Sequence, residues 1–174
     1  MKRFGVSWVL LLPAISAGAV VPLQAQSAGS ATSDKAQIEA LVKQYNDGFN
    51  ARDVEKIMSC YAPGKQVFVF DAIPPREYAS WDAYKKDWEG LFSAFPGPVK
   101  NTVSELNITV VGTVAYSRDV QSGSFTRKDG SKMNATVRAT DVYRKINGKW
   151  LIVQEHNSFP VDVETGKADL LSKP

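Results

Sequence analysis

The second half of the chain, from Val99 onward, is a run of four long stretches that are typical of β-strands. The stretches are about Val99 to Val111, Val114 to Arg127, Lys132 to Lys145 and Lys149 to Phe159. Asp129-Gly130 and Asn147-Gly148 separate the last three, and both pairs favour tight hairpin turns. Long strands joined in this way form an antiparallel meander, and at least one face of such a sheet needs a cover.

The first half of the chain supplies three predicted helices for that cover. Apolar residues recur at helical spacing after Asp34, which can cap the first helix. Asp53 precedes a second, shorter helix, and Ser80 caps a third. The apolar face of the third helix comprises Trp81, Tyr84, Trp88, Leu91, Phe92 and Phe95. A short apolar strand, Gln66 to Phe70, precedes the third helix and ends at Asp71. This order of elements predicts an α+β domain.

The first 25 residues do not look like part of this core. Met1-Lys2-Arg3 is basic, an interrupted apolar stretch follows, and Leu23-Gln24-Ala25 fits a small-residue cleavage site. We interpret residues 1–25 as a signal peptide cleaved after Ala25, which predicts a periplasmic or secreted protein. A retained membrane anchor is the alternative, although the apolar run is short for a spanning helix. Residues 26–33 are expected to be a disordered lead-in, residues 34–162 the domain and residues 163–174 a tail.

Composition excludes several classes of partner and cofactor. Loss of Lys2 and Arg3 on cleavage lowers the formal charge from +3 to +1. A nearly neutral domain lacks the basic surface that nucleic acid or an acidic membrane requires. One histidine, His156, and one cysteine, Cys60, leave no ligand set for a transition metal, and there is no glycine-rich phosphate loop. We therefore expect neither metal nor cofactor, and we expect Cys60 to be a buried thiol rather than a nucleophile.

Two registers are open for the last hairpin. A three-residue loop at Ile146-Asn147-Gly148 places Arg138 opposite His156. The remaining members of that face would be Thr140, Val142, Ile152 and Gln154. A two-residue loop at Asn147-Gly148 shifts the pairing and places Ala139 opposite His156. We favour the first register because it gathers one coherent polar cluster. The other face, suited to a subunit contact, would carry Tyr143, Leu151 and Val153.

Three strings carry a resemblance to a known family: LVKQYNDGFNARDVEKIMSCYAP, VFVFD and VRATDVYRKINGKWLIVQEHNSFPVD. They resemble the nuclear-transport-factor-2-like (NTF2-like) superfamily, and within it the ketosteroid-isomerase-like and SnoaL-like polyketide-cyclase branch. The resemblance covers about Asp34 to Asp162. It implies a cone-shaped, curved antiparallel sheet packed on three helices, an apolar pocket between them, and a homodimer formed through the sheet.

The resemblance also suggests site residues. Steroid isomerases of this family use a carboxylate base and an oxyanion hole made of a tyrosine and a protonated aspartate. The base position matches Asp71, and the tyrosine approximately matches Tyr45. Arg138 falls at the position of the acidic donor, so an anionic or enolisable ligand is expected rather than steroid isomerisation. Ordinary structural roles stay open for all three: Asp71 as a turn cap, Tyr45 as a core residue and Arg138 as an exposed strand residue.

Two functions remain open. The first is an exported domain that binds a small apolar, carbonyl-containing or anionic ligand. As an enzyme it would transfer a proton next to a carbonyl, as an isomerase, cyclase or dehydratase without a cofactor. Its catalytic residues would be Asp71, Tyr45 and His156, and its ligand-binding residues Arg138, Thr140, Gln154, Trp88 and Phe92. A neutral His156 is expected to contact the ligand rather than act as an acid, since Arg138 opposite disfavours imidazolium. The second function is a non-catalytic binding or assembly module.

Overall fold

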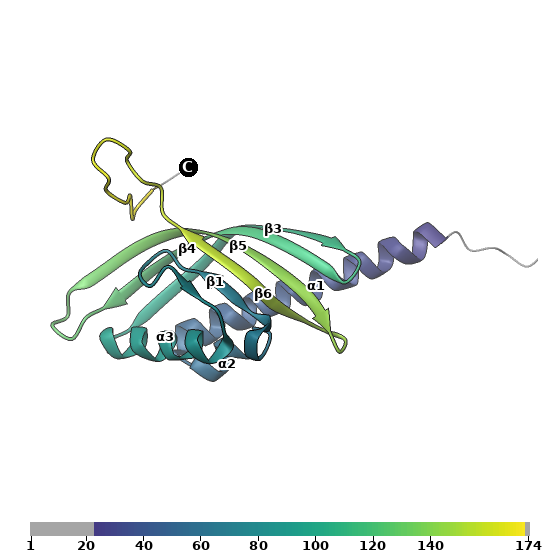
Figure 1. The fold of residues 1–174 in the computed structure, drawn as a ribbon, viewed down its shortest axis with the longest axis horizontal. Helices are drawn as coiled ribbons and strands as arrows, with labels where there is room; N and C mark the ends of the chain where they lie inside the picture. Colours follow the sequence, from purple (N-terminus) through teal and green to yellow (C-terminus); the bar gives the residue numbers. More distant parts are fainter. Residues whose placement is uncertain (1–22, 173–174) are drawn as a thin grey trace, which may run out of the picture.

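Three α-helices and a six-stranded sheet form the part of the chain that the computed structural model describes, residues 23–172 (Figure 1). The helices are α1 (Leu23–Ala51), α2 (Val54–Met58) and α3 (Trp81–Ala94), with a 3-10 turn, η1, at Gly64–Gln66. The strands are β1 (Phe68–Phe70), β2 (Glu77–Tyr78), β3 (Val99–Val111), β4 (Val114–Thr126), β5 (Lys132–Ile146) and β6 (Lys149–Ser158). The predicted α+β fold is confirmed. Residues 1–22 of the predicted signal peptide lie outside the described residues.

The sheet is mixed, in the order β2-β1-β6-β5-β4-β3. Strands β3 to β6 form the predicted antiparallel meander, whereas β1 runs parallel to β6. Figure 1 shows the sheet arching over the three helices without closing on itself. The short strand β2 was not expected, because two residues are too few for a sequence pattern. Its pairing with β1 fixes the loop that follows Asp71.

The helix starts agree with the sequence at two of three positions. Asp53 accepts a hydrogen bond from the Lys56 N–H (2.9 Å), and Ser80 accepts one from the Ala83 N–H (3.3 Å), so both predicted caps are confirmed. The third expectation, that Asp34 caps the first helix after a disordered lead-in, is wrong, because α1 begins at Leu23 and continues through residues 26–33. Two alanines and one glutamine in that segment favour helix, whereas its three serines, threonine and glycine favour it less. Among residues 23–172, no helix is long and apolar enough to cross a bilayer.

Asp34 has a structural role instead of a capping one. Its carboxylate is buried and accepts hydrogen bonds from the Lys145 ammonium (2.6 Å) and the Trp150 indole N–H (3.1 Å). Because these partners lie at the two ends of the β5–β6 hairpin turn, the contacts attach that turn to α1. Deletion of one partner of such an ion pair strongly destabilises the fold, because the other charge is left largely buried without a partner.

The β5–β6 hairpin does not adopt the favoured register. Ile146 pairs with Lys149 across a two-residue turn, in which Asn147 and Gly148 both have positive φ, as such turns require. The pairing shifts once more between Tyr143 and Val142, which leaves Val153 as an extra residue in β6. An insertion of this kind is a β-bulge, and it re-aims every side chain beyond it.

The bulge determines which side chains of β5 and β6 face the helices. Thr140 lies opposite His156, and Arg138 lies opposite Ser158 rather than opposite His156. The exposed, convex face carries Arg138, Thr140, Gln154 and His156. The concave face carries Tyr143, which is fully buried, together with Asp141 and Glu155. The predicted polar cluster therefore lies on the solvent-exposed face of the sheet. Tyr143 is buried against the helices, so it is not free for a subunit contact.

Candidate functional site

The concave face of the sheet and the helices enclose a cavity of about 350 Å³. Helices α1 and α3 form one wall, the inner faces of β3, β4 and β5 form the other, and the loop after β1 closes one end. Most of the wall is aromatic or aliphatic. Its polar side chains are Asp71, Asp87, Asn101, Gln121 and Asn157, with the hydroxyls of Tyr45 and Tyr84. A volume of this size suits a small organic ligand.

Aromatic rings shape the helical wall of this cavity. Phe49 on α1 packs edge-on against Trp88 on α3, with ring centroids 5.3 Å apart. Trp88, a predicted ligand contact, lines the cavity. Phe92, another predicted contact, does not line it: its ring packs against Phe49 at 5.9 Å and beneath the Arg52 guanidinium at 5.4 Å. The aromatic side chains thus surround the cavity without filling it.

Asp71 lies in the loop directly after β1 and lines the cavity. Its carboxylate accepts a hydrogen bond from the Ala72 N–H (2.6 Å), and its own N–H donates to the Arg76 carbonyl (3.2 Å). Burial, then the negative charge of Glu155 and that of Asp87, raise the pKa of Asp71 to about 6, and backbone N–H groups limit the rise. A carboxyl with such a pKa can exchange a proton near neutral pH.

Tyr45 lies on α1 and lines the same cavity. Its ring packs edge-on against Trp88 (6.0 Å) and Tyr61 (6.4 Å), and no hydrogen-bond partner for its hydroxyl is found among residues 23–172. Burial, followed by the charge of Glu155, raises the pKa of Tyr45 far above its usual range. The Tyr45 hydroxyl is therefore a neutral O–H that can donate a hydrogen bond.

Glu155 is a buried carboxylate whose charge acts on both Asp71 and Tyr45. It is 2 % exposed and accepts three hydrogen bonds. Tyr61 donates to Oε2 at 2.5 Å, and Tyr84 and Asn157 each donate to Oε1 at 2.7 Å. Burial raises the pKa of Glu155, and these three donors oppose the rise because they stabilise the ionised form.

Two further acids, Asp119 on β4 and Asp141 on β5, complete a buried acidic group. Burial raises the pKa of Asp119 to about 6. Burial, then Glu155 and Asp119, raise the pKa of Asp141 well above its usual range, although the Tyr143 hydroxyl donates to it at 3.1 Å. A small hollow is lined by both aspartates together with Tyr45 and Glu155. The inward acid on β5 is thus Asp141, whereas Arg138 points to solvent.

The structure brings together only part of the predicted site. Asp71, Tyr45 and Trp88 line one cavity. The exposed face, on the other side of the sheet, carries the four strand residues Arg138, Thr140, Gln154 and His156. His156 pairs with Phe70 of β1 and stacks edge-on against its ring at 5.7 Å, so it is separated from the Asp71 cavity by the sheet.

Sequence reasoning missed the buried polar groups of the sheet. Asp119 could not have been found, because its face of β4 carries the small residues Ala115 and Ser117, while the larger apolar side chains of Val114 and Tyr116 lie on the exposed face. Glu155 and Asn157 could not be found either, because the bulge at Val153 reverses the alternation within β6. Asp87 shares the cavity side of α3 with Trp88 and accepts a hydrogen bond from the Tyr78 hydroxyl.

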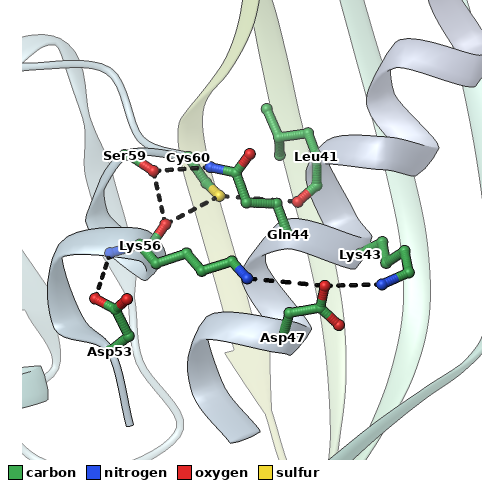
Figure 2. A network of polar contacts seen from close by, with 8 residues as sticks. All are labelled: Leu41, Lys43, Gln44, Asp47, Asp53, Lys56, Ser59 and Cys60. Carbon is green, nitrogen blue, oxygen red and sulfur yellow. Dashed lines mark hydrogen bonds and ion pairs between the residues drawn. The ribbon is translucent and has the colours of Figure 1, made fainter. Parts of the chain in front are cut away.

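Cys60 lies away from the cavity, in a polar network between α1 and α2 (Figure 2). Its thiol is buried and contacts the Leu41 and Lys56 carbonyls at 3.8 and 3.6 Å. Burial raises the pKa of Cys60 to about 12, so the thiolate is not populated at neutral pH. The prediction of a buried, unreactive thiol is confirmed. Among residues 23–172, no three His, Cys, Asp or Glu side chains are placed to hold a metal ion.

Comparison with known families shows to which family the chain belongs. The family model described as "SnoaL-like domain" matches residues 38–162. The chain belongs to the SnoaL-like domain family. No curated protein matches it.

Solved structures place this SnoaL-like domain in the NTF2-like superfamily. An NTF2-like protein of unknown function from Pseudomonas putida KT2440 is 28% identical, with a TM-score of 0.74 over 82% of this chain and 98% of that chain. An NTF2-like superfamily protein from Salmonella enterica is 18% identical, with a TM-score of 0.70 over 79% of this chain and 99% of that one. The superfamily resemblance is therefore confirmed.

Two structural neighbours of the SnoaL-like domain carry the names of dehydratases. One of them comes from Novosphingobium aromaticivorans, is described as "Putative Scytalone Dehydratase", and is 18% identical with a TM-score of 0.68. The match covers 84% of this chain and 99% of that chain. At this identity the likeness shows the shared fold alone.

Proposed function

We propose that this domain binds a small, mainly apolar carbonyl compound in the 350 Å³ cavity and moves a proton on the carbon next to the carbonyl. The reaction would be an isomerisation, cyclisation or dehydration. The observation that carries the proposal is the Asp71 carboxyl, which lines a mainly apolar cavity and whose pKa is raised to about 6. Such a group is a competent general base near neutral pH.

The other roles follow from the position of each group. Removing a proton next to a carbonyl places negative charge on the carbonyl oxygen, and a neutral hydroxyl can stabilise that charge by donating a hydrogen bond. Tyr45 supplies such a hydroxyl in the same cavity. Asp141, which lines the hollow next to Tyr45, is the buried carboxyl best able to stay protonated there. His156 and Arg138 have no part in this proposal, because they lie on the exposed face.

The decisive variant is Asp71→Asn, which keeps the size of the side chain and removes its basicity. Native mass spectrometry of protein purified from its own host would identify a bound molecule, and turnover of that molecule would be measured. We expect Asp71→Asn to lower kcat by about 10²–10⁴, while Asp82→Asn, at an exposed position of α3, leaves it unchanged. Binding without turnover in the parent protein would replace catalysis by a carrier function, and the absence of any ligand would remove both.

We also propose that the protein is exported and processed after Ala25, which would leave Gln26 as the first residue of α1. The basic start and interrupted apolar run of residues 1–25 support this. The intact mass of the protein from its own host would show the loss of 25 residues. A homodimer formed through the sheet stays a prediction.

A further inference from the structure

We propose that Glu155 is the positioning residue of the Asp71 site: its buried carboxylate supplies a fixed negative charge beside Asp71 and orients two polar side chains of the cavity wall. The inference rests on the proposed function for the role of Asp71. Glu155 does not line the cavity itself. Its contacts with the cavity run through the β1–β6 pairing and through its hydrogen-bond donors.

The pairing of β1 with β6 places Glu155 close to Asp71. Val69 lies beside Glu155 and Phe70 beside His156 in this parallel pair. One residue further, Asp71 comes level with Asn157. Because alternate residues of a strand share a face, Asp71 and Asn157 face the cavity on the side that also carries Glu155. Glu155 is thus the diagonal neighbour of Asp71 across two adjacent strands.

Hydrogen bonds decide which of the buried acids carries the charge. Glu155 accepts from three donors, whereas Asp141 accepts from one, and its Oδ1 has no partner among residues 23–172. Donors favour the ionised form of a carboxyl and burial without donors favours the neutral form. The negative charge therefore rests on Glu155. The titratable groups that face it are Tyr45 on α1, Tyr61 after α2, Asp71 after β1, Tyr84 on α3, Asp119 on β4 and Asp141 on β5.

Glu155 also determines what the cavity wall can offer a ligand. Tyr84 and Asn157 both line the cavity, and both spend a donor on Glu155 Oε1. The Tyr84 hydroxyl has a single hydrogen, so it can only accept a further hydrogen bond. Tyr45 then remains the hydroxyl that can donate to a ligand carbonyl at this end. Glu155 thereby favours one orientation of the ligand, with its carbonyl at Tyr45 and the adjacent carbon near Asp71.

The variant Glu155→Gln tests the fixed charge, because glutamine has the same shape and no charge. The pKa of Asp71 would be followed by carbon-13 NMR of the side-chain carboxyl groups, with the signal assigned through its loss in Asp71→Asn. Removal of a nearby negative charge makes ionisation easier, so the pKa of Asp71 should fall from about 6, by about one unit.

Two further variants provide a smaller shift and no shift in the pKa of Asp71 for comparison. Asp87 also raises the pKa of Asp71 but less than Glu155 does, so Asp87→Asn should lower it by a smaller amount. Asp82→Asn should leave it unchanged. A folded Glu155→Gln protein in which Asp71 titrates as before would overturn the proposal, as would a larger shift in Asp87→Asn.

If Glu155→Gln does not fold, Tyr61→Phe provides the test. Tyr61 lies outside the cavity lining and donates to Glu155 Oε2. Loss of this donor should raise the pKa of Glu155, and an unchanged titration of Glu155 would contradict its ionised state. Neither titration requires a substrate. Failure of this inference therefore leaves the Asp71→Asn turnover test of the proposed function intact, and the reverse also holds.

Discussion

Asp71 reduces the stability of the fold while making its proposed chemistry possible. An ordinary aspartate ionises near pH 4, whereas the pKa of Asp71 in the folded protein is raised to about 6 by burial and by Glu155. The folded state then binds a proton more strongly than the unfolded chain does. Stability due to this group is fully present below about pH 4, falls as the pH rises from about 4 to 6, and stays low above that range.

Asp71→Asn should therefore stabilise the protein at neutral pH. The expected gain in the free energy of unfolding is about 2–3 kcal/mol at pH 7, and it should disappear below about pH 3, where the aspartate is protonated in both states. Urea unfolding of both proteins at the two pH values measures the difference. Equal stabilities at pH 7 would show that the ionised Asp71 carboxylate does not destabilise the folded protein.

At the scale of single residues, the resemblance to the family was the source of the two predicted site residues that line the cavity. It matched Asp71 to the position after the short apolar strand and Tyr45 to the first helix. Glu155 was overlooked in favour of His156, its neighbour. The choice between them depends on a bulge, and a bulge depends on three-dimensional pairing that a pattern of period two does not contain.

Arg52 connects the ends of two helices. It terminates α1 in the left-handed region, with φ of 58°, and its guanidinium donates to the carbonyls of Phe92, Phe95 and Gly97 at 2.5, 2.7 and 2.5 Å. These carbonyls lie at and beyond the last turn of α3, where no helical N–H groups remain to satisfy them. Since Phe95 lines the cavity, Arg52 also fixes the position of the cavity wall.

Replacement of Arg52 should therefore loosen the end of α3. Arg52→Ala removes three partly buried hydrogen bonds and should lower the free energy of unfolding by about 2–4 kcal/mol. Arg52→Lys keeps the charge but not the planar fork, so it should recover only part of the loss. Urea unfolding followed by tryptophan fluorescence measures both variants. Full recovery by lysine would show that charge alone, rather than the three-way contact, holds the helix end.

At the scale of elements, local signals predicted most of the fold. The strand bounds from Val99 onward agree with the structure within one residue, because long alternating runs are interrupted by clear turn residues. The start of α1 and the strand β2 were missed. A segment of small and polar residues has no apolar periodicity to mark it as helix, and β2 exists only through its pairing with β1.

The whole molecule presents an acidic cavity inside a domain of nearly balanced charge. Asp71 and Asp87 line the cavity, Glu155 lies behind its wall, and the cavity lining contains no lysine, arginine or histidine among residues 23–172. The expected contact of Arg138 with an anionic ligand has no counterpart there, because Arg138 is exposed on the far side of the sheet. Charge complementarity therefore favours an uncharged ligand.

A pair of matched ligands tests this expectation. We expect an apolar ketone to bind at least about tenfold more tightly than a carboxylate of the same size, since a like charge must be desolvated beside Asp71. In Asp87→Asn the difference should narrow. Isothermal titration calorimetry at pH 7 measures the dissociation constants. Tighter binding of the carboxylate would place a cationic group in the site and would contradict the proposed arrangement.

Val153 has a consequence for how this family can change its chemistry. Deletion of Val153 would remove the bulge and leave Asp141 opposite Glu155 and Thr140 opposite His156, so Glu155 would stay buried. If β6 kept Val153 but lost the bulge, the pairing of the Asn147-Gly148 turn would continue along the whole strand and set Ala139 against His156. The imidazole would then face the cavity and Glu155 the solvent. The bulge alone therefore decides whether the last strand presents a carboxylate or an imidazole to the cavity.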